Sequence, residues 1–220
     1  VEWNIADGEH FAAGTVLAEV NGPARTLLTA ERTALNFLQR MSGVASLTAR
    51  YVTAIEGTGA RLLDTRKTIP GWRLLDKYAV TAGGGENHRM GLYDMVMIKD
   101  NHIVAHRSIA NAVNAVQEYF EERGIQDLGL EVETTNLDEV AEAVALPAVT
   151  RIMFDNFDSQ TMRRGVEIVG DRCETEASGG ITLESIRSYA ETGVNYISVG
   201  ALTHSAVALD LALDLESVVR

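Results

Sequence analysis

The 220-residue sequence contains a single cysteine, Cys173, so it cannot form an internal disulfide. It has no apolar run near the ~20 residues that a membrane helix requires. No signal-peptide pattern stands at its start. Hydrophobic residues still make up 46% of the chain, which is enough for a buried core. We therefore expect a globular protein without membrane contact, in the reducing conditions of the cytoplasm.

Positive charge is also scarce. The chain has 19 Lys and Arg against 31 Asp and Glu, a formal net charge of -12 and a pI near 4.8. An acidic surface repels phosphate backbones, which argues against general nucleic-acid binding. A small anion can still bind where the few cations gather. The positions of lysine and arginine are therefore informative.

From residue 61 onward, short apolar runs alternate with stretches of helical spacing. This alternation is typical of parallel strands with crossover helices. No G-x-G-x-x-G fingerprint follows the first run, which disfavours a dinucleotide-binding sheet. We predict an α/β fold with an irregular parallel βα barrel of about six strands, fewer than the eight of the standard barrel. The expected strands are 61–66, 95–100, 128–134, 151–156, 173–178 and 196–200. The expected helices are 72–82, 108–123, 137–145, 159–170 and 183–193.

The chain before residue 61 follows different patterns. Residues 1–5, 14–20 and 24–28 read as short strands separated by turns. Apolar residues then recur at helical spacing from Thr29, a plausible cap, to about Glu56. The sequence begins at Val1 inside a strand-like pattern, so we expect a further segment before it.

Polar and charged residues stand where the expected strands end. In βα barrels the active site is built at these carboxyl ends. The residues are Arg66 and Lys67 at the end of the first strand, Lys99 at the end of the second, Glu131 and Glu133 on the third, Asp155 at the end of the fourth, Ser178, Gly179 and Gly180 at the end of the fifth, and Gly200 at the end of the sixth. The loop "GGGENHR" adds His88 and Arg89.

This placement predicts a pocket for anions. Clustered cations are costly to bury without anionic partners. Glu133 and Asp155 can be those partners, or can hold a divalent metal, since Mg²⁺ is bound by one or two carboxylates plus substrate phosphates. The stretches "ASGGIT" and "SVGA" are typical of a phosphate site, because glycine lets backbone N–H groups approach an anion closely.

The cations also have an ordinary structural interpretation. Arg66 and Lys67 can pair with Asp64 and Asp100 in a network that only stabilises the fold. The common position of all these groups at one barrel face favours the functional interpretation.

The histidines and glutamates have similar alternatives. His88 and His102 are, singly, more often satisfied or surface residues than catalysts, and their spacing is not that of a zinc site. Glu131 and Glu133 share one face of a strand, because side chains alternate with period two. We expect one of the two to be structural.

Several motifs occur together in an order that resembles a known family. Residues 64–102 contain "DTRKT", "GGGENHR" and "IKDNH", which are together very specific. "TAERTALNFLQRMSG", "LEVET", "FDNF", "EASGG" and "ETGVNYISVGALTHS" fit the same pattern in order, so the resemblance covers nearly the whole chain. The sequence resembles the quinolinate phosphoribosyltransferase family of NAD biosynthesis.

The resemblance implies a reaction and a set of residue roles. Quinolinate would react with phosphoribosyl pyrophosphate, with loss of pyrophosphate and carbon dioxide, to give nicotinate mononucleotide, and Mg²⁺ would be required. Arg32, Arg66, Arg89 and Lys99 would hold the quinolinate carboxylates, with Lys67 and His88 beside them. Glu133 and Asp155 would bind magnesium and the ribose hydroxyls, and Ser178, Gly179, Gly180 and Gly200 would hold the 5-phosphate. The catalytic residues would be Lys67, Lys99, Glu133 and Asp155.

The resemblance also implies a domain division and an assembly. Residues 1–35 would be part of an α/β sandwich domain, completed by about 206–220, and residues 36–205 the barrel. Arg32 would reach the active site of a second subunit, in a homodimer or higher oligomer. Its expected place in a helix's first turn fits an arriving anion, because a cation there opposes the helix dipole.

Three other functions remain open on the sequence. A related phosphoribosyltransferase could act on another acceptor, such as nicotinate without decarboxylation, although a second carboxylate needs more cations. A Schiff-base aldolase could use Lys99 or Lys67 as its nucleophile, but such a lysine is normally desolvated with few cationic neighbours. A barrel that binds phosphate ligands without catalysis is the third.

Overall fold

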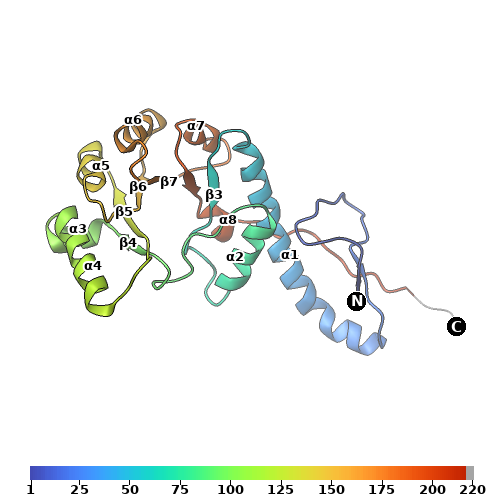
Figure 1. Ribbon diagram of the computed structural model, residues 1–220. Coiled ribbons are helices and arrows are strands. Elements are labelled where there is room, and N and C mark those ends of the chain that lie inside the picture. Colours follow the sequence, from blue (N-terminus) through green and yellow to red (C-terminus); the bar gives the residue numbers. More distant parts are fainter. Residues whose placement is uncertain (217–220) are drawn as a thin grey trace.

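The computed structural model describes residues 1–216 and contains a parallel sheet of six strands (Figure 1). The spatial order is β3-β8-β7-β6-β5-β4, so crossovers join each neighbouring pair from β4 to β8, and β3 lies beside the last strand. The bounds are β3 Arg61–Leu63, β4 Val96–Ile98, β5 Leu130–Thr134, β6 Arg151–Asp155, β7 Glu174–Ser178 and β8 Tyr196–Ser198. Each lies within a strand expected from the sequence, which confirms the six-stranded parallel α/β architecture.

The sheet is irregular between its two edge strands. In the part of the chain that the structure describes, no ladder joins β3 to β4. The segment 86–95 lies between them instead. Glu86 N–H donates to Leu62 O (2.8 Å) on β3, and Arg89 donates to Met95 O (3.1 Å) just before β4. This segment carries His88 into the space that the strands enclose.

Helices cover the outer face of the sheet, as expected for crossover connections (Figure 1). The expected helices are confirmed as α2 Arg73–Ala82, α4 Ile109–Arg123, α5 Leu137–Val144, α6 Ser159–Val169 and α7 Ile186–Ala190. Side-chain caps start three of them: Ser108 for α4, Asn136 for α5 and Asp158 for α6. Two short helices were not expected, α3 Asp100–His106 and α8 Ala201–His204.

The first part of the chain differs from the expectation at one place. Two strands are present but short, β1 Glu2–Trp3 and β2 Ala18–Glu19, and they pair antiparallel. The third expected strand, 24–28, is instead the start of α1, which runs from Ala24 to Ala54. Pro23 precedes it with a φ of -60°, a backbone angle that suits helix initiation. The Thr29 hydroxyl donates to Arg25 O (2.7 Å) within the helix, so Thr29 is not the cap.

No helix among the described residues, including the 31-residue α1, is both long and apolar enough to cross a membrane.

Gly43 lies inside α1 and does not interrupt the helix. It is buried, and a Cβ atom built on it would lie 2.2 Å from Val207 O. The glycine therefore lets the segment after α8 pass close to α1. Gln39 and Arg40 donate to carbonyls of that segment, at Leu211 and Ala206. Residues 205–216 have no helix or strand, and the remainder of the expected 206–220 part lies outside the described residues.

We expect Gly43→Ala to destabilise the protein, although alanine is the better helix former. Overpacking costs about 1–3 kcal/mol, while the gain in helix propensity is about 1 kcal/mol. Chemical denaturation would measure the difference in free energy of unfolding. Ser46→Ala, at an exposed position of the same helix, is the matched control and should be neutral or slightly stabilising. A Gly43→Ala protein more stable than wild type would contradict this packing role.

Candidate active site at the carboxyl ends of the strands

The strand register places Lys99 beside Glu133, while Asp155 lies two residues beyond Met153, the partner of Glu133 on β6. Glu133 on β5 pairs with Met153, and Asp155 on β6 pairs with Ser178 on β7. Lys99 directly follows β4 and forms an ion pair with Glu133 Oε2. The Glu133 side chain is 12% exposed and that of Lys99 42% exposed, so both face an open end of the sheet rather than the core. Of this predicted group, Lys99 and Glu133 are in contact, and Asp155 lies at the end of the neighbouring strand β6.

Backbone geometry fixes the glycine turn next to Asp155. Asn156 has a φ of 57°, its N–H donates to Ser178 O (2.9 Å), and its amide donates to Asp155 Oδ2 (2.8 Å). Gly179 has a φ of 98°, and a Cβ on it would lie 2.3 Å from Asn156 Oδ1. Only glycine fits there, because a side chain would be both strained and blocked. A Cβ on Gly180 would meet no atom within 4 Å, so this part of the turn is open.

Gly200 and Lys67 lie against each other on the neighbouring side. A Cβ on Gly200 would be 3.0 Å from Lys67 Cδ. The Thr203 hydroxyl on α8 donates to Lys67 O (2.8 Å), which ties the loop after β3 to the end of β8. Lys67 is exposed. The lysine and the glycines of the predicted phosphate site therefore come from adjacent strands, β3, β8 and β7.

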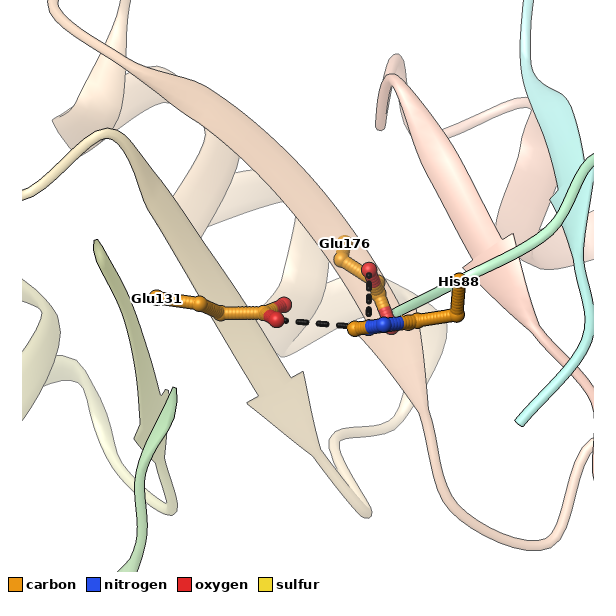
Figure 2. A group of neighbouring side chains, drawn as sticks. All are labelled: His88, Glu131 and Glu176. Atoms are coloured by element: carbon orange, nitrogen blue, oxygen red, sulfur yellow. Dashed lines mark ion pairs between the residues drawn. The ribbon is translucent and has the colours of Figure 1, made fainter. Parts of the chain in front are cut away.

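His88 lies deeper than the sequence suggested, between two glutamates (Figure 2). Its Nε2 is 3.2 Å from Glu131 Oε2 and 3.3 Å from Glu176 Oε2, and all three side chains are at most 5% exposed. Glu131 on β5 and Glu176 on β7 both point toward the same nitrogen of the histidine ring. Of the pair Glu131 and Glu133, it is Glu131 that is fully buried. This agrees with the expectation that one of them is structural.

The protonation of His88 follows from its other ring nitrogen. Burial lowers the pKa of His88, but the two glutamates outweigh burial and raise it to about 9. Arg89 N–H, however, donates to His88 Nδ1 (2.7 Å). A second proton at Nδ1 would point at that N–H group, so this contact opposes the doubly protonated ring that the glutamates favour, while Nε2 carries a proton in either form. Nε2 then faces the carboxylates as a donor and is not free to bind a metal.

Glu131 and Glu176 would place two negative charges beside His88, and protonation of Glu131 reduces this charge. Burial and the nearby Glu176 raise the pKa of Glu131 to about 7. Two carboxylates in one buried space cannot both ionise easily. His88, Glu131 and Glu176 therefore form a buried charged group beneath the open site, and Arg151 also pairs with Glu176 at 3.2 Å.

The arginines at the mouth have no acidic partners. Among residues 1–216, no carboxylate lies within 4.0 Å of a basic nitrogen of Arg66, Lys67 or Arg89. Burial lowers the pKa of Arg89, and the positive charge of Arg66 lowers it further. The alternative of a structural network is not observed, because Asp64 pairs with Lys77 instead. An acidic protein thus keeps three uncompensated cations at one end of its sheet.

Arg32 does not belong to this group within the chain. It lies eight positions after Ala24, beyond the first turn of α1, and is exposed. The helix-dipole argument from the sequence is therefore wrong, because the dipole acts only near the terminal turn. In Figure 1 the first half of α1 projects away from the sheet.

Two residues beside the site have no role in the sequence prediction: Lys77, and Glu176 at the end of the fifth expected strand. Lys77 on α2 is completely buried and bonds to Asp64. Its position three residues before the buried Val80 was a signal, because residues i and i+3 share a helix face. Glu176 aligns with Met153, and so with the interior face that also carries Asp155 and Ser178.

Comparison with known protein families matches nearly the whole chain, including all six strands of the parallel sheet. The family model described as "Quinolinate phosphoribosyl transferase, C-terminal domain" matches residues 44–214, and the N-terminal-domain model of the same name matches residues 1–42. The chain belongs to this family. The match to the N-terminal-domain model ends at residue 42 and the match to the C-terminal-domain model begins at residue 44, so the two matches meet within α1.

Relatives with solved or curated descriptions agree with this membership. The quinolinate phosphoribosyltransferase [decarboxylating] 1 of Nicotiana glauca is 46% identical over 99% of the chain and 65% of its own length. A probable nicotinate-nucleotide pyrophosphorylase of Bacillus subtilis is 46% identical over 95% of the chain and 71% of its length. The NadC structure from Streptococcus pyogenes has 40% identity and a TM-score of 0.89 over 94% of the chain and 71% of its own. The present family member thus spans 65% of the Nicotiana relative that it matches.

Proposed function

We propose that the protein transfers the phosphoribosyl group of phosphoribosyl pyrophosphate to quinolinate, with decarboxylation, in NAD biosynthesis. The products are nicotinate mononucleotide, pyrophosphate and carbon dioxide. The observation that carries the proposal is the group of cations without acidic partners, Arg66, Lys67 and Arg89, beside two carboxylates and an open glycine turn. Both substrates are polyanions, so their site must be cationic even in an acidic protein.

Quinolinate is assigned to the arginine side of the site. The positive charge of Arg66 acts on Arg89, and guanidinium groups pair bidentately with planar carboxylates. Lys99 is a third cation and is now paired with Glu133. We assign His88 to the support of this wall rather than to direct contact, because it is buried and its ring nitrogens are engaged. Several cations suit an acceptor with two carboxylates better than one with a single carboxylate.

Phosphoribosyl pyrophosphate is assigned to the glycine side. Ser178, Gly179, Gly180 and Gly200 would hold its 5-phosphate, with Lys67 beside Gly200. Glu133 and Asp155 suit Mg²⁺, since both offer hard oxygen ligands near the ends of adjacent strands. In this structure Glu133 is paired with the cation Lys99. Bound at Glu133 and Asp155, magnesium would neutralise charge that develops on the leaving pyrophosphate.

The chain's own residues act mainly by positioning and by charge. Arginine and lysine side chains hold the acceptor so that its ring nitrogen faces the anomeric carbon, which makes the encounter effectively unimolecular. Fixed cations such as Lys67 stabilise negative charge as pyrophosphate leaves. After transfer, the ring nitrogen is cationic and can accept the electrons released by decarboxylation. The substrate thus supplies its own electron sink, and no organic cofactor is required.

We expect Glu133→Gln and Asp155→Asn each to raise the Mg²⁺ concentration needed for half-maximal turnover. Each change keeps the shape of the side chain but removes an anionic ligand. A magnesium titration of steady-state activity measures the effect. Asp138→Asn, at an exposed position in the first turn of α5, is the control and should leave the titration unchanged. Unaltered magnesium dependence in both site variants would mean that these carboxylates are structural.

The choice of acceptor separates this proposal from its nearest alternative. The purified protein, with any residues that naturally precede Val1, is given phosphoribosyl pyrophosphate, Mg²⁺ and either quinolinate or nicotinate. Product formation from quinolinate alone supports the proposal, and preference for nicotinate contradicts it. Borohydride trapping with a sugar phosphate tests the aldolase alternative, which requires a covalent adduct on Lys99 or Lys67.

The proposal includes an assembly and a location. Exposed Arg32 lies on the part of α1 that points away from the sheet, so it can serve an active site only in another subunit. We therefore propose a homodimer or higher oligomer with shared sites. A cytoplasmic location fits the single cysteine, although the Arabidopsis thaliana relative is described as chloroplastic.

A further inference from the structure

Asp64 and Lys77 form an ion pair that is removed from solvent. The Lys77 side chain is 1% exposed and that of Asp64 is not exposed, and the two come from α2 and the end of β3. Burial raises the pKa of Asp64 to about 6 and lowers that of Lys77, although each partner opposes the shift of the other. Such a pair costs several kcal/mol in desolvation and is weak support for stability alone. Its remaining hydrogen bonds show what else it does.

Those bonds converge on the residue pair Asn87 and His88. Asp64 Oδ1 accepts from His88 N–H (2.8 Å), and Lys77 Nζ donates to His88 O (2.8 Å). The Asn87 amide nitrogen, in the orientation that satisfies its neighbours, donates to Asp64 Oδ2 (2.6 Å) and to Lys77 O (3.0 Å). Both main-chain groups of His88 are thus held by the two charged side chains. The position of this loop is fixed at its backbone, not only at its side chains.

The fixed backbone determines where Arg89 begins. Arg89 N–H is bound by the His88 ring, and the Arg89 guanidinium donates to Met95 O (3.1 Å) across the gap between β3 and β4. A shift of His88 would therefore move Arg89 and would also pull the histidine from between Glu131 and Glu176.

Helix α2 has other attachments to the sheet. Asp76 is paired with Arg40 of α1 at 3.1 Å and accepts from Ile69 N–H, and Ala79 and Val80 are buried in the core. The Asp64–Lys77 pair is therefore not needed merely to dock the helix. Its cost is better explained by the placement of the loop that it binds.

We propose that Asp64 and Lys77 are positioning residues, which hold the His88–Arg89 backbone so that the Arg89 guanidinium faces the acceptor. This inference rests on the proposed function, in which Arg89 binds a quinolinate carboxylate. Neither residue touches the acceptor. Their loss should impair quinolinate binding selectively, because the groups assigned to phosphoribosyl pyrophosphate lie on β5 to β8 and on the loop after β3.

The test compares Lys77→Met with the double variant Asp64→Asn/Lys77→Met. Lys77→Met alone leaves a buried charge unpaired and should lower the unfolding temperature, whereas the double variant removes both charges and should recover much of it. Calorimetry measures the affinities for quinolinate and for phosphoribosyl pyrophosphate. A displacement of about 1 Å at a site can cost about 100-fold, so we expect a loss of that order for quinolinate in both variants. Affinity for phosphoribosyl pyrophosphate should change less than about threefold.

Two further variants make the test decisive. Val113→Ala, a core change on α4, lowers stability without touching the loop and should leave both affinities unchanged. Asn87→Ala, at an exposed position, keeps the ion pair and should weaken quinolinate binding even if Lys77→Met does not fold. Quinolinate affinity that recovers with stability in the double variant, or that is unaffected by Asn87→Ala, overturns the positioning role. A wild-type protein that does not bind quinolinate contradicts the proposed function itself.

Discussion

Arg89→Ala should reduce the affinity for quinolinate by about 30-fold to 5,000-fold while binding of phosphoribosyl pyrophosphate is largely kept. This range corresponds to the 2–5 kcal/mol lost when one partner of a buried, hydrogen-bonded charge pair is removed. Arg89 is partly buried and has no carboxylate partner among residues 1–216. Its charge is therefore free for a ligand. Calorimetric titration of each substrate measures the two affinities separately.

The control and a second variant define the interpretation. Arg163→Ala removes the same charge from an exposed position of α6 and should change neither affinity. Lys99→Ala should also weaken quinolinate binding more than binding of phosphoribosyl pyrophosphate, although it frees Glu133 as well. Equal losses for both substrates in Arg89→Ala would contradict its assignment to the quinolinate carboxylates.

Mixing two inactive variants, Arg32→Ala and Arg66→Ala, should restore about a quarter of wild-type activity. In a two-fold dimer with sites completed by Arg32 of the other subunit, a mixed dimer has one site with both defects and one intact site. Random exchange makes about half of the dimers mixed, and half of their sites are intact. The measurement is steady-state turnover after subunit exchange of the full-length proteins.

The control for this experiment is exchange itself. Mass spectrometry of differently tagged subunits must show mixed dimers before the activities are compared. A mixture that stays as inactive as its components, despite such exchange, would show that Arg32 acts in its own subunit or has no role. The exposed position of Arg32 on the projecting half of α1 makes that outcome unexpected.

The six strands and the polar residues at their carboxyl ends could be predicted, because both depend on local sequence patterns. Each strand is a short apolar run, and alternation along β5 places Glu131 and Glu133 on the same face. The parallel register then brings Glu133 and Lys99 together without further information. His88 could be predicted near the site because the loop motif "GGGENHR" contains it.

The partners of buried charges could not be predicted, because they depend on contacts far apart in sequence. Asp64 had Arg66 and Lys67 beside it, yet its partner is Lys77, thirteen positions away on α2. The depth of His88 is set by Glu131 and Glu176, whose strands lie far along the chain. The start of α1 was misplaced because residues 24–28 suit either a strand or a helix, and Pro23 decides for the helix.

The most direct test of the account is release of labelled carbon dioxide from quinolinate labelled at its 2-carboxylate. The account predicts that release requires phosphoribosyl pyrophosphate and Mg²⁺ together, and that nicotinate mononucleotide forms in equal amount. Omission of either should abolish it, because the ring nitrogen becomes an electron sink only after it carries ribose. Carbon dioxide release without phosphoribosyl pyrophosphate, or mononucleotide formation without carbon dioxide, would contradict the proposed reaction.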